Sequence, residues 1–268
     1  MPVSRSLKRA AEPPARSRSY WPLILVGLAA VLAVIITALP ASIIAHFLPP
    51  TVQAEDFSGS LWHGSAGKVS VNARDAGAFE WQLHPKDLFG MTVAANLRWV
   101  KQGFMLTGAV RLDGHGIAAR DIKGGGPIED LRDLGVAAGW RGSADVNFSE
   151  LKTDFARLLA AAGEIRVSNL TSAQLADGAD LGGYELRLAD GAVDADGNVS
   201  TQLMDTGGPL DVQAIIRYSA KERTGVLSGT IMERPGAPAA LHGQLESLSQ
   251  LRGRNPQGRI PVDLEFNF

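Results

Sequence analysis

Residues 259–268 read Arg-Ile-Pro-Val-Asp-Leu-Glu-Phe-Asn-Phe, and from Ile260 onward every second residue is apolar. Such alternation places one face of a strand against a core and the other in water, as in an antiparallel sheet. The apolar residues of this run form an unbroken face, so its removal would expose apolar surface. The stretch therefore predicts a half-buried strand that belongs to the core of a β-rich fold.

The same period of two recurs through the chain, at residues 68–72, 79–83, 104–112, 184–188 and 210–216. Between these runs lie the residue types that favour chain reversal, at 75–77, 113–114, 190–191, 196–198 and 206–209. The pattern predicts a mostly β fold built on a large, curved antiparallel sheet. We expect this domain to span residues 49–268 and to form two lobes, at about 55–145 and 164–268.

The middle of the chain carries a different spacing. Leu151, Phe155, Leu158 and Leu159 recur at helical intervals before Gly163, which predicts one short helix between the two lobes. Residues 127–134 are a candidate for a further helical turn.

The N-terminal segment has the composition of a membrane anchor. Residues 1–19 form a basic arm with five Lys and Arg side chains and the single acid Glu12, and residues 23–39 are uncharged and apolar. Nineteen residues from Trp21 to Leu39 make a helix of about 28 Å, close to the ~30 Å hydrocarbon core of a bilayer. We predict a single transmembrane helix within residues 20–48. The basic arm would be cytoplasmic and residues 49–268 would lie across the membrane.

This segment has two alternative interpretations besides a transmembrane anchor. A cleavable signal peptide finds a small-residue cleavage pattern at residues 52–54, but its apolar region normally spans only about 7–15 residues. A helix buried in a soluble core would rarely stay free of charge over such a length. The uncleaved anchor fits the segment best.

Composition and charge exclude several classes of protein. The 268 residues include 26 Lys and Arg against 28 Asp and Glu, so the net charge is −2, which argues against a generally basic nucleic-acid binder. A hydrophobic content of 45% argues against a disordered chain. The absence of cysteine excludes disulfides, cysteine-ligated metals and thiol catalysis.

No constellation typical of catalysis or of metal binding stands out. The five histidines are scattered, and the glycine-rich segments 64–68, 114–116 and 124–126 lack the remaining residues of phosphate or dinucleotide loops. Asp194, Asp196, Asn198 and Asp205 match four positions of a calcium loop, but Val199 stands where that loop requires glycine. A hairpin tip explains these residues more simply. We expect no catalytic, cofactor or metal site, and a protein that is not an enzyme.

Several short motifs resemble one known family in their order and spacing. Residues 57–67 (FSGSLWHGSAG) and 79–85 (FEWQLHP) resemble the two elements that follow the anchor in type II secretion system protein N. Residues 181–184, 207–210 and 227–229 resemble its later pattern, and residues 251–266 match best. The motif positions, which we expect to be structural, are Gly59, Leu61, Trp62, Gly64, Trp81, Pro85, Gly182, Tyr184, Gly229, Gly253, Gly258 and Pro261.

This resemblance implies a non-enzymatic accessory protein of the Gram-negative inner membrane, with a periplasmic β domain. Its expected partners are other type II secretion components, namely inner-membrane proteins and the secretin, and no nucleic acid. The family is also distantly similar to AsmA-type envelope proteins, whose sheets curl into apolar grooves. That similarity leaves open an alternative in which the domain binds or conducts lipid. Strand alternation alone does not separate a groove from a closed core.

Overall fold

The computed structural model describes residues 27, 34, 37–175, 178–222 and 224–267. The chain divides into two units, residues 1–39 and 40–268. The second unit holds nearly all of the described residues, including every strand.

Thirteen strands are described, and their bounds are β1 (Val52–Gly59), β2 (His63–Val71), β3 (Arg74–Leu83), β4 (Val93–Lys101), β5 (Phe104–Asp113), β6 (Gly116–Pro127), β7 (Trp140–Thr153), β8 (Leu158–Ser172), β9 (Gly183–Leu188), β10 (Val199–Gly207), β11 (Leu210–Ser219), β12 (Thr224–Glu233) and β13 (Ile260–Asn267). The helices of this unit within the described residues are the 3-10 helices η1 (Ala41–Phe47), η2 (Pro85–Gly90) and η3 (Ile128–Leu134) and the α-helix α2 (Ala239–Arg252).

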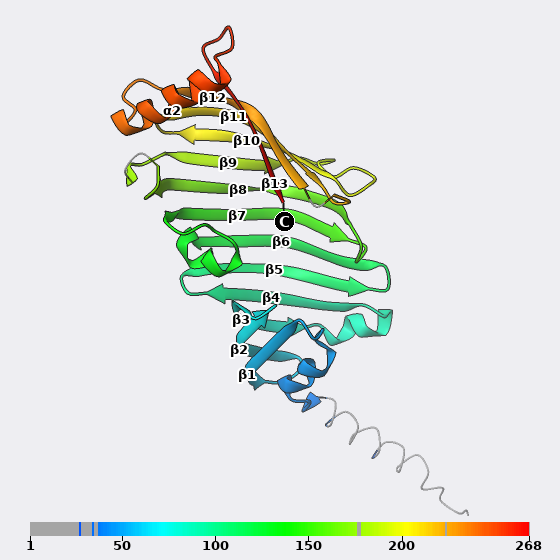
Figure 1. Ribbon diagram of the computed structural model, residues 1–268. Helices are drawn as coiled ribbons and strands as arrows, with labels where there is room; N and C mark the ends of the chain where they lie inside the picture. The colour runs from blue at the N-terminus through cyan, green and yellow to red at the C-terminus, as the bar shows by residue number, and fades with distance from the viewer. Residues whose placement is uncertain (1–26, 28–33, 35–36, 176–177, 223, 268) are drawn as a thin grey trace, which may run out of the picture. The chain divides into compact units, whose positions relative to one another are not determined.

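All thirteen strands belong to one antiparallel sheet, in which their spatial order is their order in the sequence (Figure 1). Each strand therefore pairs with the strands before and after it, and β1 and β13 form the two edges. The runs of alternating residues predicted from the sequence fall in β2, β3, β5, β9, β11 and β13, although Asn72 lies just beyond β2 and Phe268 lies outside the described residues. The prediction of a mostly β fold with one large antiparallel sheet is confirmed.

The helix predicted between the two lobes is wrong. Leu151 lies in β7 and Leu158 begins β8, and these two strands pair directly with each other. The four residues between them form a tight turn, in which Asp154 Oδ1 accepts the backbone N–H groups of Ala156 and Arg157. The leucine spacing that looked helical spans a hairpin. The sheet thus continues without a break through this region, whereas the helical turn expected at 127–134 is present as η3.

One predicted chain reversal is also misplaced. Asp75 and Gly77 lie inside β3, where Asp75 Oδ1 accepts the N–H of Gly77 at 2.9 Å. The backbone irregularity there shifts the register between β2 and β3 without reversing the chain. The reversal begins three residues earlier, at Asn72 and Ala73, which both have left-handed φ angles.

The register of the strands gives the sheet one apolar and one polar face. The apolar row is a line of directly paired residues that crosses all thirteen strands and contains only apolar residues and glycine. Its members are Phe57, Ala66, Phe79, Trp99, Leu106, Gly124, Val146, Ile165, Leu186, Leu203, Ala214, Gly229 and Val262.

The neighbouring line of pairs, which points to the opposite face, is almost wholly polar. This polar row consists of Ser58, Ser65, Glu80, Arg98, Thr107, Lys123, Asn147, Glu164, Arg187, Gln202, Ile215, Ser228 and Asp263. Ile215 is its only apolar member. Adjacent residues of a strand point to opposite faces, so the two rows define a sheet that is amphipathic across its whole width.

The apolar face is covered only in places. Helix η3 packs over Phe104 and Ala144 through Ile128, and α2 packs over Leu181 and Ile260. Half of the fully buried apolar residues described are alanines, and most large side chains of the apolar row are only half-buried. No second sheet lies over this face within the described residues, since all thirteen strands belong to the same sheet. The sheet is therefore a single layer with a partly open apolar side.

The predicted transmembrane run at 23–39 lies largely outside the described residues. Within the part of the chain that the structure describes, no helix has the length and apolar character needed to cross a membrane. Residues 41–47, which fall within the predicted anchor, form η1 next to β1 and β2.

Candidate functional site

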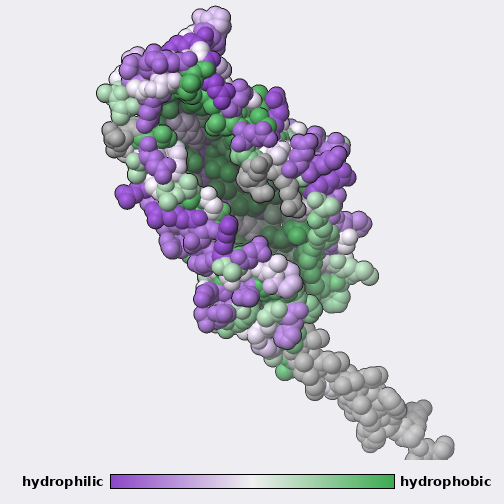
Figure 2. Space-filling model, in the orientation of Figure 1, coloured by the Kyte–Doolittle hydropathy of each residue, from purple (hydrophilic) through white to green (hydrophobic). Residues whose placement is uncertain are grey.

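The described residues enclose an apolar hollow of about 520 Å³ between the second half of the sheet and α2. Val167 of β8 and Val262 of β13 both line it, although four strands separate them in the sheet order. The sheet must therefore curl so that its last strands face β8 across the hollow. Figure 2 shows the cavity on this side, with a hydrophobic floor between hydrophilic rims. Its volume lies within the ~300–1,000 Å³ typical of ligand pockets.

The lining of the hollow is almost free of polar side-chain atoms. Tyr184, Thr230 and Trp140 are the only residues of the lining that carry one. The Tyr184 hydroxyl donates to the Leu181 carbonyl at 3.0 Å, and Thr230 Oγ1 accepts from Arg259 Nε at 2.7 Å. Burial, together with the charge of Asp205, raises the pKa of Tyr184 to about 12, so its hydroxyl stays neutral at physiological pH. The hollow thus presents an uncharged surface with few groups for polar recognition.

Exposure along β13 shows which end of the hollow is closed. Ile260 is 1% exposed, Val262 is half-buried and Leu264 is 55% exposed, although all three lie on the same side of the strand. Ile260 packs with Leu181 of the loop before β9 and with Leu241 of α2. The hollow is therefore blind at the α2 end and open towards Leu264.

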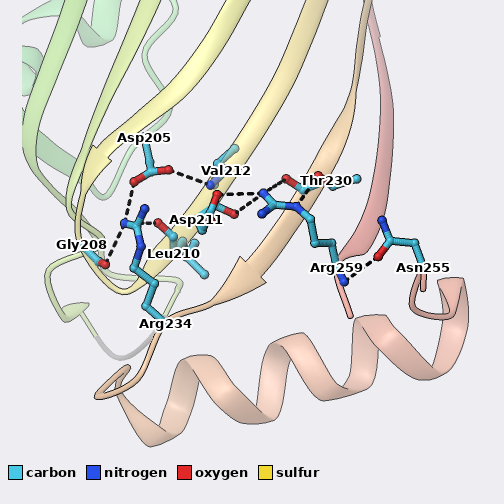
Figure 3. Close-up of polar contacts among 9 residues, drawn as sticks. All are labelled: Asp205, Gly208, Leu210, Asp211, Val212, Thr230, Arg234, Asn255 and Arg259. Carbon is cyan, nitrogen blue, oxygen red and sulfur yellow. Dashed lines mark hydrogen bonds and ion pairs between the residues drawn. The ribbon is translucent and has the colours of Figure 1, made fainter. Parts of the chain in front are cut away.

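Two ion pairs tie the last strands together beside the blind end (Figure 3). Arg234 contacts Asp205 of β10 at 2.6 Å and donates to the Leu210 carbonyl at 2.9 Å. Arg259 contacts Asp211 of β11 at 2.8 Å, and this guanidinium lowers the pKa of the Asp211 carboxyl. Both arginines thus neutralise carboxylates, one in β10 and one in β11. Arg234 follows β12 directly and Arg259, which also donates to Thr230 of β12, directly precedes β13, so these contacts link β10 and β11 to the segments on either side of α2.

The first group of motif residues forms one structural corner. Gly59 and Gly64 face each other across the β1–β2 hairpin, and Trp81 Nε1 donates to the Leu61 carbonyl at 2.9 Å. A Cβ on Gly64 would lie 2.7 Å from the Trp81 ring, so the close packing requires glycine there. The carbonyl of Trp62 accepts the N–H of Leu83 at 2.8 Å. These contacts fix the loop between β1 and β2 against β3.

The later motif residues are spread over the second half of the sheet. Gly182 has a φ of +89° and packs against Gly207, and Gly229 leaves room for Ala214 in the neighbouring strand. Tyr184 and Gly229 line the hollow, whereas Gly253 and Gly258 lie after α2 and before β13. The remaining motif positions are Pro85, which begins η2, and Pro261, which lies in β13. Of the motif positions, only Tyr184 and Gly229 line this hollow, whereas Gly59, Gly64 and Trp81 line a separate pocket over the first strands.

The carboxylates spaced like a calcium loop do not converge. Asp194 Oδ1 accepts the N–H groups of Asp196 and Asn198, which closes a hairpin tip. Asp205 instead pairs with Arg234. Within the described ranges, no group of three or more His, Asp or Glu side chains is placed to hold a metal ion.

Lys101 is a buried charged residue whose contacts are all with the protein's own strands and helix. Lys101 of β4 is 2% exposed, and its ammonium group donates to the Asp75 carbonyl and pairs with the carboxylates of Asp75 and Asp133 at 2.9 and 3.1 Å. Burial opposes the charged form, but the two carboxylates outweigh it and raise the pKa of Lys101. This cluster joins β3, β4 and η3.

Sequence reasoning did not predict the hollow or α2. The signal for the helix was present, since Leu241, Leu245 and Leu248 recur at helical spacing between Pro238 and Gly253. The hollow has no such local signal, because its lining comes from η3, α2 and strands β7 to β13.

A search of curated proteins gives no match to this chain, and neither does a search of solved structures. The family model described as type II secretion system (T2SS), protein N, matches residues 50–263. That match covers the sheet from just before β1 into β13, together with the glycine and tryptophan positions of the β1–β2 corner and the lining of the hollow except Leu264. The chain therefore belongs to the family of type II secretion system protein N.

Proposed function

We propose that this protein is a non-enzymatic accessory component of the type II secretion pathway, which exports folded periplasmic proteins across the outer membrane. The family match over the entire width of the sheet supports this role. Its β-rich unit offers extended surfaces and strand edges for binding, and the polar clusters described above are satisfied by internal partners.

The proposed location is the inner membrane, with a cytoplasmic N-terminus, one spanning helix and a periplasmic sheet. The basic arm before the apolar run supports this orientation. Because the chain has no cysteine, single cysteines report topology without background. A membrane-impermeant thiol reagent should label Asp121→Cys, on an exposed position of β6, in cells whose outer membrane alone is permeabilised. It should label Ser6→Cys only after the inner membrane is opened, and the reverse result would exclude this topology.

The free edge of β13 is the surface we propose for partner binding, by addition of a strand from another secretion component. Among the described strands β13 pairs with β12 alone, so its other side is an edge to which a further strand can be added. The opposite edge is less suitable, because Asp56 interrupts β1 with a left-handed φ and η1 packs against β1. Pro261, which has no N–H to donate, limits addition at the start of β13.

Site-specific photo-crosslinking in cells tests this edge. A photoreactive residue at Glu265 should capture an inner-membrane or secretin component of the secretion machine, whereas the same residue at Arg98, in the middle of the polar row, should not. Asp263→Lys combined with Glu265→Lys should weaken the capture measured from a nearby position. Intact capture in that double variant would rule out recognition at this edge.

A second candidate function is lipid binding, and the apolar row favours it. Thirteen consecutive apolar or glycine positions, only partly covered, make a continuous apolar path across the sheet. Exposed apolar patches of such extent mark sites that bind proteins, membranes or apolar ligands. Phospholipid that copurifies with the full-length protein in more than trace amounts would support this function, and a lipid-free preparation would count against it.

A further inference from the structure

We propose that the hollow under α2 is a blind-ended site for one acyl chain of a membrane phospholipid. This inference rests on the second candidate function and deepens it, because it names the ligand, the place and the direction of entry. Under this proposal the domain retains a single lipid and does not conduct lipids along the sheet.

The chemistry of the lining selects hydrocarbon over a polypeptide. A bound peptide brings one N–H and one carbonyl per residue, and each costs free energy if it is buried without a partner. Among the lining side chains, Tyr184 and Thr230 already bond within the protein, which leaves the single indole N–H of Trp140. The floor of a sheet offers no further donors, because its backbone groups bond between strands. An acyl chain makes no such demand.

The gradient of exposure on β13 sets the orientation of the ligand. Leu264 stands at the open end and Ile260 at the end closed by Leu241. From Ile260 to Leu264 the strand rises about 13 Å. The hollow can therefore hold a stretch of acyl chain that lies along β13, and it is not a channel through the sheet. The methyl end would lie against Leu241, and the headgroup would remain in solvent beyond Leu264.

The ion pairs at the blind end support retention. Asp205 is only 8% exposed in its side chain, and it is neutralised by Arg234, which is not among the residues that line the hollow. Arg259 does the same for Asp211. These pairs hold β10 and β11 to the segments that bracket α2, so the cap over the blind end is fixed by charge as well as by the leucines of α2. A through-channel would require this end to open.

Two adjacent residues of β10 give a matched pair for the test. Leu203 belongs to the apolar row and lines the hollow, whereas Gln202 belongs to the polar row on the other face. A diazirine side chain is placed at either position of the full-length protein in cells, the sample is irradiated, and adducts are identified by mass spectrometry. We expect intact phospholipid masses on the Leu203 variant and none above background on the Gln202 variant.

A variant at the entrance tests the orientation. Leu264→Asp should abolish the phospholipid adduct at Leu203, because a carboxylate at the mouth repels the lipid phosphate and removes apolar contact. Leu264 is 55% exposed, so this change leaves the core intact. The control is Ile215→Asp, which adds the same charge at a 38% exposed position of the polar row and should leave the adduct unchanged.

Several outcomes would overturn the proposal. Equal lipid adducts on both faces would indicate mere closeness to the membrane. Peptide adducts at Leu203 would show that the occupant is a polypeptide. Adducts with the mass of free fatty acids would show that the acyl chain does not come from a membrane phospholipid. If lipid adducts are missing while Glu265 still captures secretion components, this inference fails and the proposed secretion role stands.

Discussion

Replacement of the buried Lys101 by methionine provides a direct measure of how the first strands are held together. The ammonium group makes two bonds to Asp75 and one to Asp133, at 2.8 to 3.1 Å, from a side chain that is only 1% exposed. Hydrogen bonds to charged groups contribute about 1.5–3 kcal/mol each when buried. Both carboxylates are about half exposed, which screens their share. We expect Lys101→Met to lower the free energy of unfolding by about 2 kcal/mol in total.

Lys101→Ala should cost more, because it also deletes the three methylenes beyond Cβ. At ~0.8 kcal/mol for each buried methylene the further loss is about 2 kcal/mol, or about 4 kcal/mol in all. Urea unfolding of the full-length protein in detergent, followed by tryptophan fluorescence, measures both values. Trp99 reports on this region, since its indole donates to the Ala76 carbonyl beside Asp75.

With a denaturant slope of about 2 kcal/mol per molar, Lys101→Met should move the urea midpoint down by about 1 M at constant slope. The matched control is Lys123→Met, an exposed position of the polar row, which should change stability by less than about 0.5 kcal/mol. A Lys101→Met midpoint equal to that of the wild type would refute the reasoning, because it would mean that the ammonium group contributes nothing beyond its alkyl chain.

Three further outcomes are expected. The hydrogen bond from Lys101 lowers the pKa of Asp75. The ionised Asp75 carboxylate therefore stabilises the fold at neutral pH, and this contribution is lost as the pH falls below about 4. The free energy of unfolding should accordingly fall less with acid in Lys101→Met than in the wild type. Arg234→Ala leaves the nearly buried carboxylate of Asp205 without its counter-charge, bonded to the Val212 N–H, and should lower the free energy of unfolding by about 3 kcal/mol in urea titrations, with partial recovery in Arg234→Lys. Trp81→Phe removes an indole bond to a backbone carbonyl of the β1–β2 loop and should cost about 1 kcal/mol; loss of amide hydrogen-exchange protection limited to that loop is the expected signature.

Six of the thirteen described strands, namely β2, β3, β5, β9, β11 and β13, could be predicted with their faces from the sequence, because alternation is a local property. Trp99 lies in β4, which was not among them, so its pairing with Phe79 and Leu106 is known from the structure alone. Local sequence signals led to wrong predictions where the same residue pattern is compatible with two different structures. An aspartate two residues before a glycine caps a chain reversal at some positions and a bulge at Asp75. Apolar residues four apart, such as Leu151, Phe155 and Leu159, can span a hairpin as well as a helix turn.

The hollow could not be predicted, because alternation is the same in a closed core and in an open groove. The difference lies in what covers the apolar face, and that depends on contacts distant in sequence, such as Leu241 of α2 against Ile260. Curling of the sheet, which brings Val167 and Val262 to one cavity, results from twist accumulated over many strands. Neither effect has a signature within a window of a few residues.

The two proposed activities meet on β13. Its outer edge is the proposed contact with a partner strand, while Val262 and Leu264 on its apolar face form a wall of the hollow. A strand added to that edge would extend the wall and cover more of an acyl chain lying beside Leu264. Lipid in the hollow would in turn order β13 and favour pairing. Such coupling is reciprocal, so the partner would raise the affinity for lipid by the same factor as lipid raises the affinity for the partner.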